Sequence, residues 1–144
     1  MRQLRSEVEI KASPEKVWRV LTDFKSFPTW NPFIREAQGK LVPLSQLKIR
    51  LMIGRRLVTF YAYVTVVDPP RELRWIARQR LAGIFDVDRR FELERVGRSQ
   101  VRLVQSERAT GLLAPVLVPI LRRRIQQGYR ALESALQDRV QHVH

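Results

Sequence analysis

An arginine and a glutamate interrupt the apolar faces of two neighbouring predicted strands. The segment 83–110 predicts a β-hairpin whose first strand alternates apolar and charged residues, and Arg89 falls on the apolar face. Glu107 interrupts the apolar face of the second strand in the same way. The two charges could neutralise each other as an ion pair, or the Arg89 guanidinium could anchor a carboxylate or phenolate of a ligand. Both roles remain open from the residues alone.

Charges on both faces of this hairpin favour one register. We predict that Arg89 lies opposite Glu107 on the inner face. The same register brings Glu94 against Arg102 on the outer face. This register requires a three-residue turn at 97–99. The glycine at 97 favours a two-residue loop, but that loop would shift the register by one residue and move every side chain to the other face, so we expect the longer turn.

The composition excludes several kinds of chemistry. The chain has no cysteine, which rules out disulfides, thiolate nucleophiles and Cys-based metal sites. Its two histidines, His142 and His144, fall among the last three residues, where helices and strands usually fray. We therefore expect no metal and no cofactor.

The net charge of +13 is spread over the whole chain. Residues 1–72 carry 13 Lys or Arg against 7 Asp or Glu, and residues 73–144 carry 14 against 7, which gives +6 and +7. One dense cluster, Arg122–Arg124, is typical of a solvated helix face. We therefore expect no specific nucleic-acid binding, and contact with an anionic membrane surface stays an alternative that we do not favour.

The 144 residues, of which 44% are hydrophobic, predict one domain that spans 1–144. The first eleven residues alternate polar and apolar side chains from the outset, so no signal peptide is visible and we expect a cytoplasmic protein. That alternation predicts a strand, and Ser13 followed by Pro14 predicts the start of an amphipathic helix. Pro28 and Pro32 then place Trp30 on a rigid corner.

Most of the following segment predicts strands. We expect strands near 33–40, at 47–53 and at 57–67, then another in ELRWIARQ after a turn at 68–71. Alternation places Leu51, Phe60 and Trp75 on the inner face, where each is either core or the lining of a cavity.

The last segment predicts a long helix that covers the sheet. Apolar residues recur at spacings of three and four, with Pro119 expected to kink the first turns. The stripe comprises Leu117, Leu121, Ile125, Tyr129, Leu132, Leu136 and Val140. Polar residues, including Glu133, are predicted to lie elsewhere on the helix surface.

The order of these elements resembles the START-like, or SRPBCC, helix-grip superfamily, which includes polyketide cyclases and carriers of hydrophobic ligands. The resembling stretches are ASPEKVWRVLTDFKSFPTWNPFI, DPPRELRW and GIFDVDRRFELERVGRSQVRLVQSERATGLL. The resemblance implies an α+β fold in which a curved seven-stranded antiparallel sheet wraps round a long C-terminal helix, with two short helices after the first strand.

This resemblance also implies a cavity between the sheet and the terminal helix, with Trp30 and Phe33 closing one end. The predicted lining comprises Trp30, Phe33, Leu51, Phe60, Trp75, Arg89, Phe91, Gln105 and Glu107. Relatives near this pattern often carry histidine at the position of Arg89, so the arginine argues against histidine-based chemistry.

Three classes of function follow. The favoured one is a non-enzymatic carrier or sensor of a small hydrophobic or amphipathic molecule of lipid, polyketide or aromatic type. Kinship with cyclases implies an alternative, a cyclase or dehydratase-like enzyme in which Glu107 is the general base and Arg89 stabilises an enolate. A basic protein that binds a membrane surface or a partner is the third. We expect a monomer or a weak homodimer, because Tyr61, Tyr63 and Ile76 offer only a modest apolar patch on the outer face.

Overall fold

Seven strands and the helices that cover them make up the part of the chain described by the computed structural model, residues 2–78 and 83–143. In chain order these are β1 (Arg2–Ile10), α1 (Pro14–Thr22), the 3-10 helix η1 (Phe24–Ser26), α2 (Phe27–Trp30), β2 (Ile34–Gln38), β3 (Gln46–Ile53), β4 (Arg56–Asp68), β5 (Glu72–Arg78), β6 (Asp86–Gly97), β7 (Gln100–Thr110) and α3 (Ala114–His142). The end of the strand predicted in ELRWIARQ, at residue 79, lies outside the described residues.

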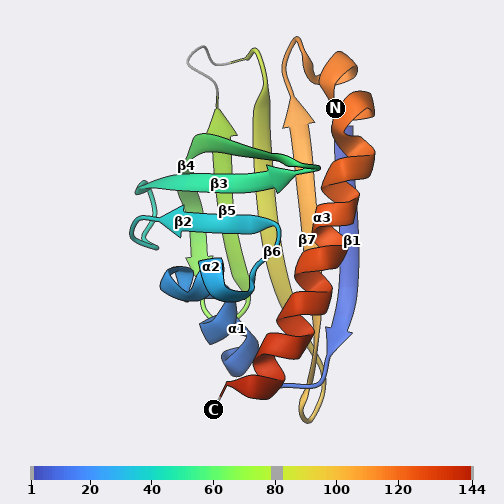
Figure 1. Ribbon diagram of the computed structural model, residues 1–144. Helices are drawn as coiled ribbons and strands as arrows, with labels where there is room; N and C mark the ends of the chain where they lie inside the picture. Colours follow the sequence, from blue (N-terminus) through green and yellow to red (C-terminus); the bar gives the residue numbers. More distant parts are fainter. Residues whose placement is uncertain (1, 79–82, 144) are drawn as a thin grey trace.

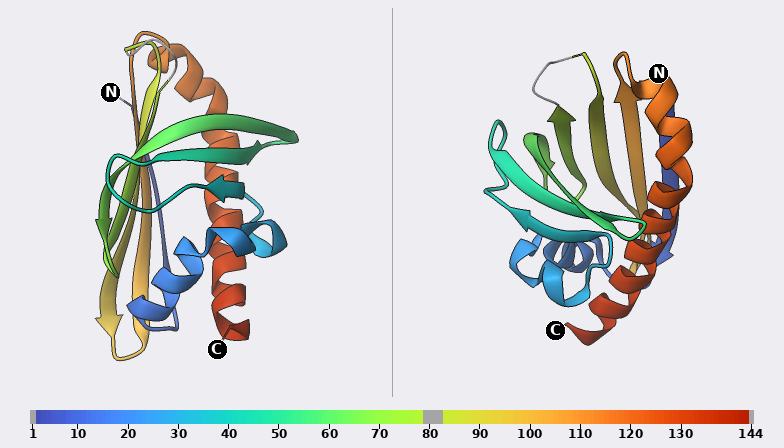
Figure 2. Two further views of the ribbon diagram at one scale, coloured as in Figure 1. Left: turned by 90° about the vertical axis from the view of Figure 1, so that its left-hand side faces the viewer. Right: turned by 45° about the horizontal axis from the view of Figure 1, so that its top comes forward.

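All strands join one antiparallel sheet in the order β1-β7-β6-β5-β4-β3-β2. The sheet curls strongly, so that β2, β3 and β4 cross in front of the other strands, and α3 runs along the concave side (Figure 1). Two further views show the short helices α1 and α2 beside the C-terminal half of α3 (Figure 2). The α+β helix-grip architecture predicted from the sequence is therefore confirmed.

The β6–β7 hairpin has the predicted register. Arg89 is paired with Glu107 in the ladder. The predicted three-residue turn is wrong, because a bulge between Arg95 and Gly97 allows a two-residue turn at 98–99 without changing the register further along. A single bulge costs less than moving every side chain of two strands to the wrong face.

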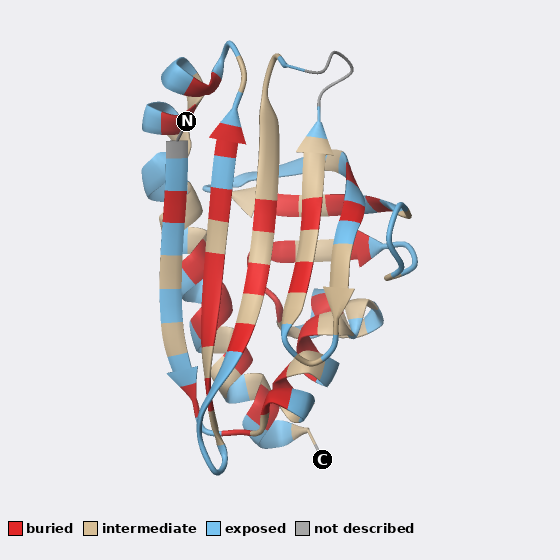
Figure 3. Cartoon of the chain, turned by 180° about the vertical axis from the view of Figure 1, so that it is seen from behind, coloured by how far each residue is buried: buried red, intermediate tan, exposed pale blue. Residues whose placement is uncertain are grey.

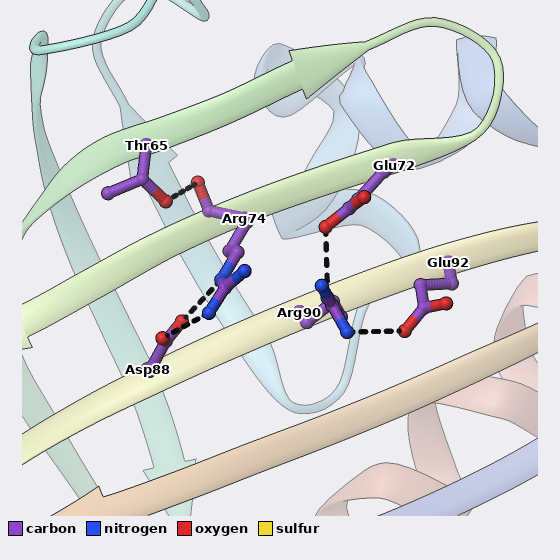
Figure 4. Close-up of polar contacts among 6 residues, drawn as sticks. All are labelled: Thr65, Glu72, Arg74, Asp88, Arg90 and Glu92. Atoms are coloured by element: carbon purple, nitrogen blue, oxygen red, sulfur yellow. Dashed lines mark hydrogen bonds and ion pairs between the residues drawn. The ribbon is translucent and has the colours of Figure 1, made fainter.

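Buried and more exposed residues alternate along much of β5, β6 and β7, as seen from the outer side of the sheet (Figure 3). Two arginines of this face, Arg74 and Arg90, meet carboxylates across the strands (Figure 4). Arg74 donates two hydrogen bonds to Asp88, at 2.9 and 2.7 Å. Arg90 donates to Glu72 at 2.9 Å. On β5 and β6 this face therefore carries charges that are paired across the strands.

Side-chain caps hold the segment between β1 and β2. The Oγ atom of Ser13 accepts a hydrogen bond from the Lys16 amide at 3.2 Å, which confirms the predicted start of α1. At the proline-rich corner, the Oδ1 atom of Asn31 accepts hydrogen bonds from the amides of Phe33 and Ile34, at 3.0 and 2.8 Å. Asn31 thereby fixes the direction in which the chain enters β2.

The apolar stripe of α3 is buried along only part of its length. Tyr129, Leu132, Leu136 and Val140 are each 0% exposed. The earlier members Leu117, Leu121 and Ile125 are only half-buried. Pro119 lies inside this first part, and the first turns of α3 bend away from the axis of the rest (Figure 2). Among the described residues, no helix has the length and apolar character needed to cross a membrane.

Gly128 marks the closest approach between α3 and the corner before β2. A Cβ atom at this position would overlap the ring of Phe33, whose Cγ would lie only 2.9 Å away. Replacing glycine by alanine inside a helix ordinarily stabilises it by about 1 kcal/mol. We expect Gly128→Ala to destabilise the protein instead, by about 1–3 kcal/mol, because the ring must move within a closed core. Chemical denaturation measures this, and Gln127→Ala on the exposed side of the same turn is the control.

Candidate functional site

A pocket of about 560 Å³ lies between the first half of α3, the β3–β4 hairpin and the strands β5, β6, β7 and β1. We call it the α3 pocket. Most of its lining is aliphatic or aromatic. The lining residues are Leu4, Leu51, Ile53, Arg56, Val58, Thr59, Phe60, Tyr61, Trp75, Ala77, Arg78, Phe85, Val87, Arg89, Glu107, Ala109, Leu117, Val118, Leu121, Arg122, Arg124 and Ile125. Its volume lies within the usual range for binding sites of small molecules.

An ion pair between Arg89 and Glu107 lies in the wall of this pocket. The Nη1 atom of Arg89 donates to the Oε1 atom of Glu107 at 2.8 Å. The two residues are only 3% and 8% exposed. The predicted cross-strand pair is confirmed, and both partners line the pocket. Burying either charge alone would cost free energy of folding. The strand register places the two charges side by side, and their pairing reduces this cost.

Aromatic rings hold the guanidinium of Arg89 in place. Its Cζ atom lies 4.6 Å from the ring centroid of Phe91, 4.6 Å from that of Tyr129 and 5.4 Å from that of Phe33. These rings come from β6, α3 and the corner before β2. Cation–π attraction is strongest where water is excluded, so the three rings hold the guanidinium in a fixed position.

The polar network continues from Arg89 towards α3. The Nη2 atom of Arg89 donates to the Oε1 atom of Gln105 at 2.7 Å, and the Nε2 atom of Gln105 donates to the Oε2 atom of Glu133 at 3.0 Å. Glu133 is 6% exposed. The prediction that Glu133 lies on the outer surface of the helix is therefore wrong, because Gln105 satisfies the carboxylate inside.

Two buried polar atoms next to this network have no hydrogen-bond partner among the described residues. They are the hydroxyl of Tyr129 and the Nε atom of Arg89. Burial raises the pKa of the Tyr129 hydroxyl well above its usual range, and the positive charge of Arg89 opposes part of that change. Tyr129 is therefore a neutral hydrogen-bond donor at any ordinary pH.

The structure brings five of the nine predicted lining residues to the pocket: Leu51, Phe60, Trp75, Arg89 and Glu107. Whether any of them contacts a ligand stays a prediction. Phe91 and Gln105 lie two residue pairs further along the hairpin and are 1% and 0% exposed. They contact Arg89 on the side away from the pocket.

Trp30 and Phe33 are not among the residues that line the α3 pocket. Trp30 packs edge-on against Phe27, with ring centroids 5.5 Å apart. Phe33 packs against Gly128 and Tyr129, in the second half of α3. The pocket lies beneath the first half of the same helix, so both aromatics belong to the closed core.

The sequence reasoning missed the contribution of α3 itself. Leu117, Leu121 and Ile125 were expected to be core, and they line the pocket while remaining half-buried. Arg122 and Arg124 line it as well, although the arginine cluster was interpreted as a solvated face. The available signal was the change in character along this helix, from an apolar and proline-containing start to a polar second half.

The chemistry open to this site is limited. The residues that the structure describes include no cluster of His, Cys, Asp and Glu suited to a metal ion. Glu107 is the one carboxylate of the pocket lining, and Arg89 already binds it. The site can therefore enclose an apolar body, and it can present a carboxylate and a guanidinium to a polar atom of that body.

Comparison with protein families gives one match. The model described as "Polyketide cyclase / dehydrase and lipid transport" matches residues 1–141. Comparison with curated protein sequences finds no match.

Solved structures with the same fold include a START superfamily protein from Mycobacterium smegmatis, with a TM-score of 0.78 and 23% identity over 99% of both chains. The Zhui aromatase/cyclase from Streptomyces sp. R1128 has a TM-score of 0.77 and 15% identity over 97% of this chain and 93% of its own. Norcoclaurine synthase from Thalictrum flavum has a TM-score of 0.74 and 12% identity over 98% and 94%. The resemblance to the START-like superfamily seen in the sequence is confirmed, and at these identities the likeness concerns the fold.

Proposed function

Because the chain belongs to the polyketide cyclase/dehydrase and lipid transport family, we propose that it binds a small hydrophobic or amphipathic molecule in the α3 pocket, as a carrier or sensor. One observation carries the proposal: Leu117, Leu121 and Ile125 of the apolar stripe of α3 are only half-buried and line a space of about 560 Å³ between this helix and the sheet. A helix that only stabilised the sheet would bury its whole stripe, since unfilled apolar volume costs stability.

The polar groups of the site support binding more than catalysis. Both terminal nitrogens of Arg89 are engaged, by Glu107 and Gln105. The Oε1 atom of Glu107 already accepts a hydrogen bond from Arg89. The same carboxylate can accept a further hydrogen bond from a hydroxyl or N–H group of the ligand.

A filled pocket tests the proposal. We expect Leu121→Trp, on the pocket side of α3, to weaken the binding of the neutral fluorophore N-phenylnaphthylamine at least about tenfold, because the indole occupies the space of the ligand. The matched control is Ile120→Trp, on the next residue of the helix, which is 65% exposed and does not line the pocket. Equal affinity in the two variants, or no binding by the unaltered protein, would refute the proposal.

A cyclase or dehydratase-like enzyme is the second candidate, because Glu107 and Arg89 both line the pocket and lie side by side. Native mass spectrometry of the purified protein, followed by incubation with any compound that copurifies, separates the two candidates. A carrier releases the compound unchanged. An enzyme converts it, and Glu107→Gln then abolishes conversion while the compound still binds.

A further inference from the structure

The lining of the α3 pocket carries a large excess of positive charge. Five of its residues are arginines and one is a glutamate, which gives +5 − 1 = +4. Arg89 and Glu107 cancel each other within the wall. The remaining four, Arg56, Arg78, Arg122 and Arg124, are exposed at the mouth, and we call them the mouth arginines.

The mouth arginines differ from those of the outer sheet face. Arg74 and Arg90 on that face are each held by carboxylates (Figure 4). Within residues 2–78 and 83–143, none of the mouth arginines forms an ion pair. Three of them lie in segments without any acidic residue, because 37–67 contains Arg56, 108–132 contains Arg122 and Arg124, and neither segment has an Asp or Glu.

The β3–β4 turn brings the arginines of two separate elements to one opening. Gly54, with φ +64°, lies against the side chain of Arg124, and a Cβ there would come within 3.2 Å of the Arg124 Cδ atom. The positive φ of this turn favours glycine, and the close approach places the turn directly beside Arg124. Arg56 begins the strand that follows this turn.

Among the described lining residues, the positive charges that no carboxylate neutralises are those at this mouth. In the wall, the Glu107 carboxylate repels an anion. Both terminal nitrogens of Arg89 already donate hydrogen bonds, to Glu107 and Gln105. At the mouth, several guanidinium groups of one sign stand over apolar walls, an arrangement that concentrates the electric field and attracts anions. Guanidinium groups bind carboxylate and phosphate oxygens in a planar, bidentate geometry.

We infer that the ligand is an amphipathic anion, with an apolar body in the pocket and a carboxylate or phosphate group held by the mouth arginines. This inference rests on the proposed function, since it names the class of molecule that the same pocket accepts. The ion pair of Arg89 and Glu107 then lies beside the apolar body and contacts a neutral polar group where the ligand has one.

Three probes of equal chain length test the inference: dodecanoate, dodecyl phosphate and dodecanol, each competing with N-phenylnaphthylamine. We expect both anions to displace the fluorophore at about five- to tenfold lower concentration than the alcohol. The preference should shrink when the ionic strength rises to about 1 M, where the screening length falls to about 3 Å. A preference for dodecanoate would identify a carboxylate ligand, and one for dodecyl phosphate a phosphate ligand.

The variant Arg122→Gln/Arg124→Gln should lose the preference for the two anions over dodecanol, with each displacement measured relative to the variant's own affinity for N-phenylnaphthylamine. The matched control is Arg123→Gln/Arg130→Gln, which removes two exposed charges from the same helix outside the lining. Binding of the fluorophore without any preference for anions overturns the inference and leaves the proposed function standing. The inference is also overturned if Arg122→Gln/Arg124→Gln keeps the preference for anions, or if Arg123→Gln/Arg130→Gln loses it to the same extent. Absence of fluorophore binding overturns both.

Discussion

Deleting residues 117–144 is expected to abolish the cooperative thermal transition and leave an aggregated or molten chain. The deleted part of α3 includes four side chains that are 0% exposed, Tyr129, Leu132, Leu136 and Val140. Burying such side chains stabilises a protein by about 1.5–3 kcal/mol each, or about 6–12 kcal/mol for the four. The net stability of a domain is about 5–15 kcal/mol, so the sheet would not survive the loss of its cover.

Circular dichroism in the near and far ultraviolet measures this result. The shortened chain should show no sharp thermal transition, and its near-ultraviolet signal should be lost. Removing only residues 142–144 is the control and should cost far less, since it leaves all four buried side chains in place. A cooperative transition in the chain that ends at residue 116 would contradict the role of α3 in the helix-grip fold.

Removing either partner of the buried ion pair is expected to destabilise the protein by about 3–5 kcal/mol. Arg89→Met leaves the Glu107 carboxylate uncompensated, and Glu107→Gln leaves the Arg89 guanidinium uncompensated. Both groups are almost fully buried, and three aromatic rings surround the guanidinium. The cost comes from the charge left behind, so the double variant should be less destabilised than the sum of the single variants.

The control is a second cross-strand pair, Arg74 and Asp88 on the outer face, whose side chains are 33% and 28% exposed. Water screens these groups, so a cycle built on Arg74→Met and Asp88→Asn should give a coupling energy of only about 0–1 kcal/mol. Unfolding by urea measures both cycles. Strictly additive effects at Arg89 and Glu107 would contradict a coupled pair inside the molecule.

The fold could be predicted from the sequence because several kinds of local information agree. Ser13 and Pro14 indicate the start of α1, and the alternation of β6 and β7 separates their faces. The charges then select one register, and Arg89 meets Glu107 as expected. The predicted turn of this hairpin was wrong, since the bulge before it depends on backbone geometry that the pattern of side chains does not contain.

The extent of the pocket could not be predicted in the same way. Whether an inward-facing residue is core or lining depends on how closely α3 approaches the sheet at that level. Phe33 fits against α3 because position 128 is a glycine. Its ring thereby fills the space between the second half of this helix and the sheet. Leu121, on the same apolar stripe, has no comparable partner and faces open space. The helical period of the sequence predicts which side of α3 a residue faces. It contains no information about the distance between that side and the sheet.

Glu133 shows a second limit of sequence reasoning. A carboxylate on a helix is usually exposed, and nothing in the local pattern distinguishes this one. Its burial depends on Gln105, which is 28 residues earlier in the chain and donates a hydrogen bond to it at 3.0 Å. Such a polar contact becomes visible only when both elements are placed in space.

The three tryptophans of the chain offer the most direct test of the account. Only Trp75 lines the α3 pocket, while Trp18 and Trp30 pack elsewhere against the core. In an NMR titration with N-phenylnaphthylamine, we predict that the indole N–H resonance of Trp75 shifts saturably and that those of Trp18 and Trp30 stay unchanged. Shifts confined to Trp18 or Trp30, or no shift at all, would contradict a ligand site between the sheet and the first half of α3.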